Sequence, residues 1–327
     1  MDAKIRWGLI GPGHIASKFI EDLKLVGDAQ ITAVASRNPD RAGAFAKIHK
    51  IPHSFGSYEA LLESGTVDVV YIATPHSFHK TWALAALERG VAVLCEKPLG
   101  TSRAEVAELV ESARQRKVFL MEALWSRFNP SIRKVKELVD EGQIGTLGYL
   151  HADFAFYALD RNLESRLLNP VLASGSLLDI GIYPIFLAYL LLGMPESLQA
   201  SSNFHENGTE LQTSMIFHYP RAQAVLYSGL LGRSKMEAEL SGTLGELYLR
   251  PRWHVADGFS LVKNGETEEF DLPLIGGGYY YEILEVHSCL RAGRIESSLW
   301  SHQNSLDLGE LLDRVRKESG IGFPFEI

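Results

Sequence analysis

The chain has 327 residues, of which 46% are hydrophobic and 22% are charged, and its formal net charge is -8. This length predicts two domains, and the composition is that of an ordinary soluble globular protein. The acidic balance provides no basic surface for nucleic acid or for an anionic membrane, so we expect a small-molecule ligand instead of either partner.

The chain begins with a pattern of strand, turn and helix. Residues 5–10 form an apolar-rich strand, and a helical pattern runs to residue 25. The turn between them has the order Gly-x-Gly-x-x-Ala, in which the glycines permit a tight bend close to a pyrophosphate and the alanine permits close helix-to-strand packing. Free N-H groups at the start of the helix would face the phosphates. The predicted cofactor-binding residues of the turn are Gly11, Gly13, His14, Ile15 and Ala16.

The second strand, at residues 31–35, ends in Ser36-Arg37-Asn38. Enzymes specific for NAD(H) usually carry an Asp or Glu here to hold the ribose 2′-hydroxyl, and this chain has none. Ser36 and Arg37 can instead bind a 2′-phosphate, with Arg41 as a second cation one helical turn later. The alternative is that both arginines are simply solvated. This pattern favours NADP(H) over NAD(H).

The strand at residues 91–95 is a continuous apolar run that ends in Glu96-Lys97-Pro98. Such a run is typical of a parallel strand covered on both faces, and open α/β sheets bind ligands at the carboxyl ends of their strands. Pro98 biases Lys97 toward an extended backbone, so the amine is held in one direction. The alternative is a surface ion pair that closes the strand.

The strand at residues 67–73 ends at the same edge, in a segment with two histidines. His76 and His79 have a spacing that suggests a metal, but no third ligand has suitable spacing. We therefore predict no metal, and hydrogen bonds from these rings to cofactor or backbone. The predicted cofactor contacts at this edge are Thr74, Pro75, His76, His79, Glu96 and Lys97.

Alternation of strand and helix up to residue 121 predicts a doubly wound parallel sheet. A strand at residues 147–156 and a run of strands from residue 199 to residue 249 without helices between them predict a largely antiparallel sheet, with a hairpin at Asn264-Gly265. The fold class is therefore α/β. We place an NADP(H)-binding domain at residues 1–123 and an α+β domain, whose sheet has one open face, at residues 124–327.

The most apolar stretch, residues 177–194, contains Asp179, Gly181 and Pro184, so we interpret it as a buried core helix and not as a membrane span. On a helix, Asp179 and Tyr183 share one face. An apolar helix buries a carboxylate and a phenol only if they have partners or a purpose. We therefore predict that both side chains take part in catalysis.

The glycine turn, Glu96-Lys97-Pro98 and the helix of Asp179 together resemble the family of glucose-fructose oxidoreductase, inositol dehydrogenase and MocA-like proteins, nearly from end to end. Within this family the chain is most similar to the dimeric dihydrodiol dehydrogenase and D-xylose dehydrogenase subgroup. The segments that carry this likeness are residues 121–128, 169–170 and 177–183. Much of the wider family carries His at the position of Tyr183, which argues against an inositol-type site.

The resemblance implies that the first domain is a Rossmann domain and that the second binds substrate and dimerises through its open sheet. It also implies that Lys97 and Tyr183 face the substrate hydroxyl, with Asp179 beside them. Oxidation of a carbinol carbon by nicotinamide requires the hydroxyl proton to leave at the same place. A tyrosine pKa of about 10 is too high for a base at neutral pH, and a nearby lysine cation lowers it. We assign Tyr183 as acid/base, Lys97 as its electrostatic partner and Asp179 as the orienting group. The roles of Lys97 and Tyr183 could be exchanged, since their titrations would be coupled.

These patterns predict an NADP(H)-dependent oxidoreductase that moves hydride between nicotinamide and a carbon of a cyclic sugar, such as a D-xylose-like aldopyranose, or of a trans-dihydrodiol. Trp125, Phe128 and Phe154 would form an apolar wall for the ring, and Arg127 and Asp179 would bind its hydroxyls. The alternative for the aromatic residues is interdomain packing. Two other functions stay open, namely a cofactor-binding sensor and a lyase or glycosidase with a transient redox step.

The cellular setting is suggested by two features. Cys95 and Cys289 lie among apolar neighbours and are expected to be free thiols. The first strand begins at residue 5, which leaves no room for a signal peptide. We expect a cytoplasmic homodimer.

Overall fold

The computed structural model describes residues 3–326. The chain forms two compact units. The first contains the residues up to Trp125 and a returning segment, Ile275–Leu306, and the second contains Ser126–Leu274 and the residues from Asp307 onward. One parallel sheet and one mostly antiparallel sheet confirm the predicted α/β class.

The returning segment joins the first unit through contacts between residues far apart in the sequence. The carboxylate of Asp22 accepts the backbone N-H of Gly277 at 2.7 Å and that of Tyr280 at 3.1 Å. The indole N-H of Trp7 donates to Nε2 of His287 at 2.9 Å. Such contacts leave no sign in the polarity pattern along the chain. For this reason the sequence analysis assigned the segment to the second domain, with the residues that precede it.

The first unit is built on a six-stranded parallel sheet with the order β3-β2-β1-β4-β5-β6. Its strands are β1 (Ile5–Ile10), β2 (Ala29–Ala35), β3 (His53–Phe55), β4 (Val69–Ile72), β5 (Ala92–Glu96) and β6 (Leu120–Ala123). The order reverses between β1 and β4, so the loops after these two strands meet at the carboxyl edge where such sheets bind ligands. The predicted doubly wound sheet is confirmed.

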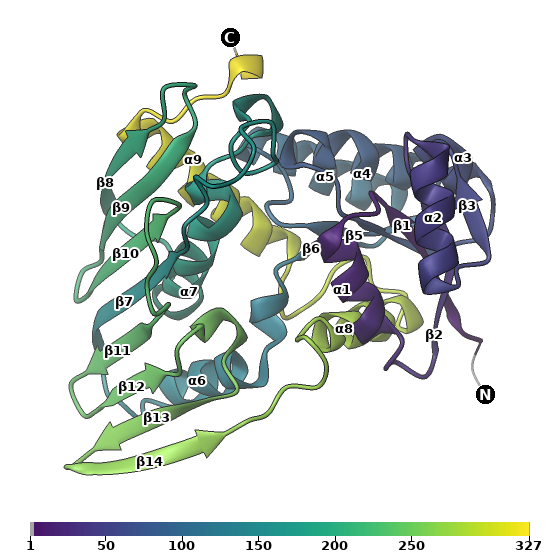
Figure 1. Ribbon diagram of the computed structural model, residues 1–327. Helices are drawn as coiled ribbons and strands as arrows, with labels where there is room; N and C mark the ends of the chain where they lie inside the picture. Colours follow the sequence, from purple (N-terminus) through teal and green to yellow (C-terminus); the bar gives the residue numbers. More distant parts are fainter. Residues whose placement is uncertain (1–2, 327) are drawn as a thin grey trace. The chain divides into compact units, whose positions relative to one another are not determined.

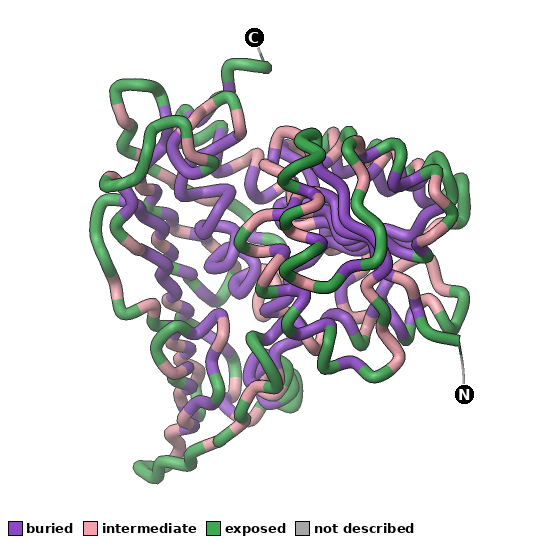
Figure 2. The backbone as a smooth tube through the Cα atoms, turned by 45° about the vertical axis from the view of Figure 1, so that its right-hand side comes forward, coloured by how far each residue is buried: buried purple, intermediate pink, exposed green. Residues whose placement is uncertain are grey.

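Helices cover both faces of this sheet. They are α1 (His14–Leu23), α2 (Pro39–His49), α3 (Tyr58–Glu63), α4 (His79–Glu88), α5 (Arg103–Arg116) and, from the returning segment, α8 (Tyr280–Arg291). Figure 1 shows α4 and α5 on one side of the strands and α1 and α8 on the other. The central strands are buried (Figure 2), and Leu9, Tyr71 and Leu94 are fully inaccessible, which explains their continuous apolar runs.

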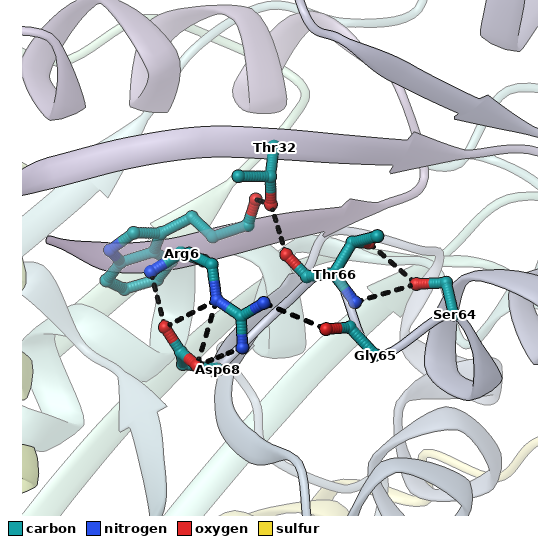
Figure 3. Close-up of polar contacts among 7 residues, drawn as sticks. Arg6, Thr32, Ser64, Gly65, Thr66 and Asp68 are labelled. Carbon is teal, nitrogen blue, oxygen red and sulfur yellow. Dashed lines mark hydrogen bonds and ion pairs between the residues drawn. The ribbon is translucent and has the colours of Figure 1, made fainter.

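A polar cluster fixes the strand register at the amino edge of this sheet (Figure 3). The backbone N-H and the guanidinium of Arg6, on β1, donate to the carboxylate of Asp68 at 2.7 and 2.6 Å, and the guanidinium also donates to the carbonyl of Gly65 at 2.8 Å. The hydroxyl of Thr32, on β2, donates to the carbonyl of Thr66 at 2.8 Å. Because the cluster lies at the opposite edge from the glycine turn, we interpret it as structural.

The second unit is built on an eight-stranded sheet with the order β14-β13-β12-β11-β7-β10-β9-β8. Its strands are β7 (Leu147–Ala155), β8 (Ser197–Phe204), β9 (Glu210–His218), β10 (Gln223–Gly229), β11 (Ala238–Gly242), β12 (Glu246–Leu249), β13 (Gly258–Lys263) and β14 (Glu266–Asp271). Only β7 and β10 pair in parallel, so the prediction of a largely antiparallel sheet is confirmed. Asn264 and Gly265, with φ of 54° and 79°, form the predicted hairpin turn.

Helices α6 (Pro130–Asp140) and α7 (Ile182–Leu192) lie on one face of the second sheet, and among residues 3–326 no helix covers the other face (Figure 1). The last helix, α9 (His302–Ser319), begins in the first unit and ends in the second. By length and hydropathy the helical stretch Pro170–Leu192 could span a membrane, but 78% of its most apolar window is buried inside the fold. This stretch is therefore core, as predicted.

Candidate active site

The glycine turn between β1 and α1 shows why glycine is needed there. Gly11 has a φ of +92°, and a Cβ atom built on it would lie 2.8 Å from the carbonyl oxygen of Ala73, at the end of β4. Gly13 is the N-cap of α1 and offers no side-chain acceptor, so the first N-H groups of the helix are left for an anion. The hydroxyls of Thr74 and Ser77 are buried without a hydrogen-bond partner among residues 3–326. These features fit a bound dinucleotide. Helix α1 begins with the other predicted residues, His14, Ile15 and Ala16.

The residues predicted to bind a 2′-phosphate follow β2. The guanidinium of Arg37 lies over the ring of Phe78, 5.2 Å from its centroid, so an aromatic ring supports this cation. Arg41 donates twice to the carbonyl oxygen of Pro12, at 2.9 and 3.2 Å, and thereby connects α2 to the glycine turn. Ser36 is buried at the end of β2, and its hydroxyl accepts a nearby backbone N-H at 3.2 Å. The structure thus gives the two arginines different surroundings.

His79 connects the loops that follow β4 and β5. Its Nδ1 lies 2.7 Å from the carbonyl oxygen of Pro98, and its Nε2 lies 2.9 Å from that of Thr74. The ring is fully buried, and burial lowers its pKa. His76 packs edge-on against it, with ring centroids 5.6 Å apart. The predicted hydrogen bonding of His79 to backbone is confirmed, and within residues 3–326 no three His, Cys, Asp or Glu side chains gather as a metal site requires.

Lys97 follows β5 directly and is buried, with 8% of its surface exposed. Its backbone N-H donates to Oε2 of Glu96 at 3.2 Å, and the phenol of Tyr71 donates to Oε1 of the same carboxylate. The peptide bond after Lys97 is cis. Further along, the carboxylate of Glu122, on β6, accepts the N-H of Leu99 at 2.9 Å. These contacts fix the backbone on both sides of the lysine.

Buried acidic groups surround the Glu96 carboxylate. Glu282, on α8, is fully buried, and neither of its carboxyl oxygens has a hydrogen-bond partner in the described part of the chain. Burial, followed by the charges of Glu96 and Asp22, raises the pKa of Glu282 well above the ordinary carboxyl range. Burial and then Glu96 also raise the pKa of the Tyr71 phenol. These shifts favour the protonated forms of Glu282 and Tyr71 around Glu96.

The predicted aromatic wall begins with Trp125. In the first unit its indole stacks on Tyr279, with ring centroids 4.7 Å apart and planes 17° apart, so one face of the ring is already covered. In the second unit, Phe128 is 2% exposed and belongs to the interior, whereas Arg127 is only partly buried.

Asp179 and Tyr183 lie on a helix of the second unit that starts in π geometry. The π turn covers Leu177–Gly181, and α7 continues from there. We expected an α-helix throughout, and a π turn is a feature often found at functional sites. Both side chains are buried, with 6% and 5% of their surface exposed. The carboxylate of Asp179 accepts a hydrogen bond from the half-exposed guanidinium of Arg166 at 2.6 Å.

Two further rings surround the Tyr183 phenol in the second unit. Phe154, on β7, has its ring centroid 5.5 Å from that of Tyr183. His254 stacks on Phe154 at 4.1 Å and also lies 5.5 Å from Tyr183. All three side chains are buried, so Tyr183 lies in a packed aromatic cluster.

Sequence reasoning missed three residues of these clusters and one further buried acid, Glu210. Arg166 lies in a turn and His254 in a short 3-10 helix, where no periodicity singles them out. Glu282 and Glu210 are acids at buried positions of a helix and a strand, and both are at least 98% buried. A search for acids at positions where the pattern predicts an apolar residue would have found these two.

The comparisons with known proteins show the family of this chain. Residues 5–124 match an oxidoreductase family with an NAD-binding Rossmann fold, and residues 132–248 match the GFO/IDH/MocA C-terminal domain. The chain is 37% identical to the trans-1,2-dihydrobenzene-1,2-diol dehydrogenase of Mus musculus, over 98% of both chains, and 36% identical to that of Homo sapiens with the same coverage. The chain belongs to the GFO/IDH/MocA family of oxidoreductases. The family resemblance in the sequence is thereby confirmed.

Two solved structures resemble this GFO/IDH/MocA protein over almost its whole length. A 3-ketoreductase from Actinomadura kijaniata, crystallised with NADP and TDP-benzene, is 28% identical, with a TM-score of 0.87 over 97% of this chain and 98% of that one. An aldose-aldose oxidoreductase from Caulobacter crescentus has a TM-score of 0.88 over the same shares of the two chains, and its 21% identity supports the fold alone. The first unit is therefore an NAD(P)-binding Rossmann domain, and its protein is an oxidoreductase.

Proposed function

We propose that the protein is an NADP(H)-dependent dehydrogenase or reductase acting on the CH-OH group of a cyclic sugar, such as an aldopyranose, or of a trans-dihydrodiol. The observation that carries the proposal is the buried side chain of Lys97, at the same edge of the sheet as the glycine turn. Its backbone is fixed by the bond from its own N-H to Glu96 and by the contact of His79 with the next carbonyl, that of Pro98. Diol dehydrogenases among the relatives and a ketoreductase solved with NADP support the substrate class and the cofactor.

The bound nicotinamide supplies hydride chemistry, and the residues of this chain supply the proton chemistry. In the oxidative direction the substrate C-H bond breaks and its electron pair leaves with the hydride, while the O-H proton passes to the phenolate of Tyr183 and a C=O bond forms. The cation of Lys97 stabilises that phenolate, and Asp179, with Arg166 as its partner, orients the substrate. The amine of Lys97 is the alternative proton acceptor.

NADP(H) is the proposed cofactor because a cation stands where enzymes specific for NAD(H) usually carry an acid. Arg37 is held on the ring of Phe78, and Ser36 is adjacent to it in sequence. Arg41 contributes by holding the glycine turn through Pro12. The other proposed cofactor contacts are the turn residues Gly11 to Ala16 and the residues Thr74, Pro75, His76, His79, Glu96 and Lys97.

The substrate ring would lie against aromatic side chains. Phe154 lies next to Tyr183, and Trp125 would be a further wall residue and Arg127 a hydroxyl ligand. Phe128, which is interior, would support the wall from behind. Residues 1–123, together with the returning segment Ile275–Leu306, would form the cofactor domain, and the rest of residues 124–327 would form the domain for substrate and dimerisation.

We also propose a cytoplasmic homodimer that forms through the second sheet. The sheet face without helices exposes Tyr149, Val225 and Tyr248, each at least 37% exposed, on β7, β10 and β12. Large apolar side chains on an uncovered sheet are typical of an interface. Two free, buried thiols, Cys95 and Cys289, suit a reducing compartment.

The test is a turnover assay with purified protein, NADP+ or NAD+, and a panel of aldopyranoses and vicinal diols. We expect reduced nicotinamide to accumulate with NADP+ and at least one of these substrates. NADPH binding without turnover on any of them would favour a sensor, and a cofactor that returns unchanged while product forms would favour a lyase or glycosidase.

A further inference from the structure

Glu210, the first residue of β9, is a buried acid that none of the proposed chemistry uses. It is 2% exposed, and its carboxylate accepts three hydrogen bonds. Oε2 accepts the backbone N-H of Leu177 at 2.8 Å, and Oε1 accepts the hydroxyls of Ser176 and Thr213 at 2.6 and 2.7 Å. Ser176 and Leu177 lie at the start of the π turn that carries Asp179. The acid therefore connects this turn to the sheet.

The surrounding glycines show how closely the turn is held. Gly175 has a φ of +119°, and a Cβ atom there would lie 2.8 Å from Oε2 of Glu210. On the other side, the hydroxyl of Ser228, on β10, lies 2.9 Å from that of Ser176 and would lie 2.7 Å from a Cβ atom on Gly181. Only glycine at these two positions lets the turn approach β9 and β10 this closely.

A carboxylate is well suited to this place. The first N-H groups of a helix lack partners within the helix, and a negative charge there interacts favourably with the helix dipole. Burial raises the pKa of Glu210, while the hydrogen bonds from Ser176, Leu177 and Thr213 oppose that shift. If Glu210 is replaced, Leu177 loses its acceptor and the π turn loses its attachment to β9, so it can relax toward ordinary α geometry. That relaxation would rotate Asp179 relative to Tyr183.

We propose that Glu210 is a positioning residue, which fixes the π turn and thereby holds Asp179 and Tyr183 in the geometry that the reaction needs. The inference rests on the proposed function, because those two residues are the proposed orienting group and acid/base. Misplacement of reacting groups by about 1 Å costs roughly a hundredfold in rate. Loss of Glu210 should therefore lower kcat strongly and leave cofactor affinity unchanged, since the cofactor turn belongs to the first unit.

The experiment compares Glu210→Gln with Tyr189→Phe. The control removes a hydrogen bond of similar kind, from the Tyr189 hydroxyl to Asp307 at 2.7 Å, further along the same helix. In Glu210→Gln an NH2 group replaces one of the two carboxylate oxygens. That NH2 group then faces groups that also donate, namely the Leu177 N-H or the hydroxyls of Ser176 and Thr213. Backbone hydrogen exchange, followed by mass spectrometry, should speed up over residues 177–183 in Glu210→Gln and stay as in the wild type in Tyr189→Phe. Unchanged exchange in Glu210→Gln would overturn the inference whether or not turnover is found.

The second readout is kinetic. At a temperature well below melting, Glu210→Gln should lower kcat by about ten- to a hundredfold with unchanged NADPH affinity. Glu210→Asp should lose less kcat than Glu210→Gln, and Tyr189→Phe should keep the wild-type kcat. If Glu210→Gln does not fold, Thr213→Val, which removes one donor to the carboxylate, should show the same changes at smaller size. Wild-type kcat in these variants would overturn the positioning role alone, whereas absence of turnover in the wild type would overturn the proposed function.

Discussion

Replacement of Glu282 by Gln should stabilise the protein at neutral pH, and less so in mild acid. The side chain is fully buried and lacks hydrogen-bond partners in the described part of the chain, and burial with the nearby Glu96 and Asp22 raises its pKa well above the ordinary range. The unfolded chain ionises this carboxyl above a pKa of about 4.3, whereas the folded chain does not. The contribution of Glu282 to the free energy of unfolding is therefore lost as the pH rises from the unfolded pKa of about 4.3 toward the raised pKa of the folded state.

The size of the effect follows from proton linkage. Each pH unit between the unfolded and folded pKa costs about 1.4 kcal/mol, so two units, from about pH 5.5 to about pH 7.5, amount to at most about 2.7 kcal/mol. Gln carries no charge at either pH, and a protein of this size shifts its melting temperature by roughly 2–4 °C per kcal/mol. Thermal melting at both pH values should show that the advantage of the variant over the wild type is several degrees larger at the higher pH than at the lower pH.

The matched control is Glu88→Gln, the same chemical change at an exposed position of α4. We expect similar melting shifts for Glu88→Gln at both pH values. A Glu282→Gln variant whose advantage is the same at both pH values, or which is less stable at the higher one, would refute the reasoning, because the buried carboxyl would then be ionised in the folded protein without cost.

Two further predictions concern the cofactor and the oligomer. Arg37→Asp should weaken NADP(H) binding by about ten- to a hundredfold, because a hydrogen bond to a charged group contributes about that much, and it should change NAD(H) binding little. The control, Lys47→Asp on the exposed face of α2, should affect the binding of neither cofactor. Equal losses for both cofactors, by titration of intrinsic fluorescence, would count against a 2′-phosphate site. Val225→Lys should convert the proposed dimer to monomers in size-exclusion chromatography with light scattering. Ile48→Lys, on α2 at a position that is 73% exposed, should not. A Val225→Lys dimer would place the interface elsewhere.

The parts of the fold that depend on neighbours in the chain could be predicted from the sequence. The apolar run of β5, the Gly-x-Gly-x-x-Ala turn and the Asn264-Gly265 hairpin each follow from periodicity or from the backbone freedom of glycine. The antiparallel character of the second sheet followed from strands in direct succession, but the parallel pairing of β7 with β10 did not, because these strands are joined through two others and a helix.

The parts that depend on distant residues were out of reach. The π turn of Asp179 is attached to Glu210, more than 30 residues later, and the returning segment joins the first unit through Asp22, about 255 residues earlier. Local patterns for the α7 stretch predict only an apolar helix. The surroundings of Arg41 also depend on a long-range contact. The sequence suggested Arg41 as a second phosphate ligand, and in the structure its guanidinium donates to the carbonyl of Pro12.

The central claim is that Lys97 and Tyr183 handle the proton of one hydroxyl while nicotinamide takes the hydride, and single turnover with NADP+ and the best substrate of the panel tests it most directly. Lys97→Met and Tyr183→Phe should each lower the rate of nicotinamide reduction by about a hundred- to ten-thousandfold, the usual value of acid-base catalysis, with NADPH affinity close to wild type. Near-wild-type reduction rates in either variant would contradict the account.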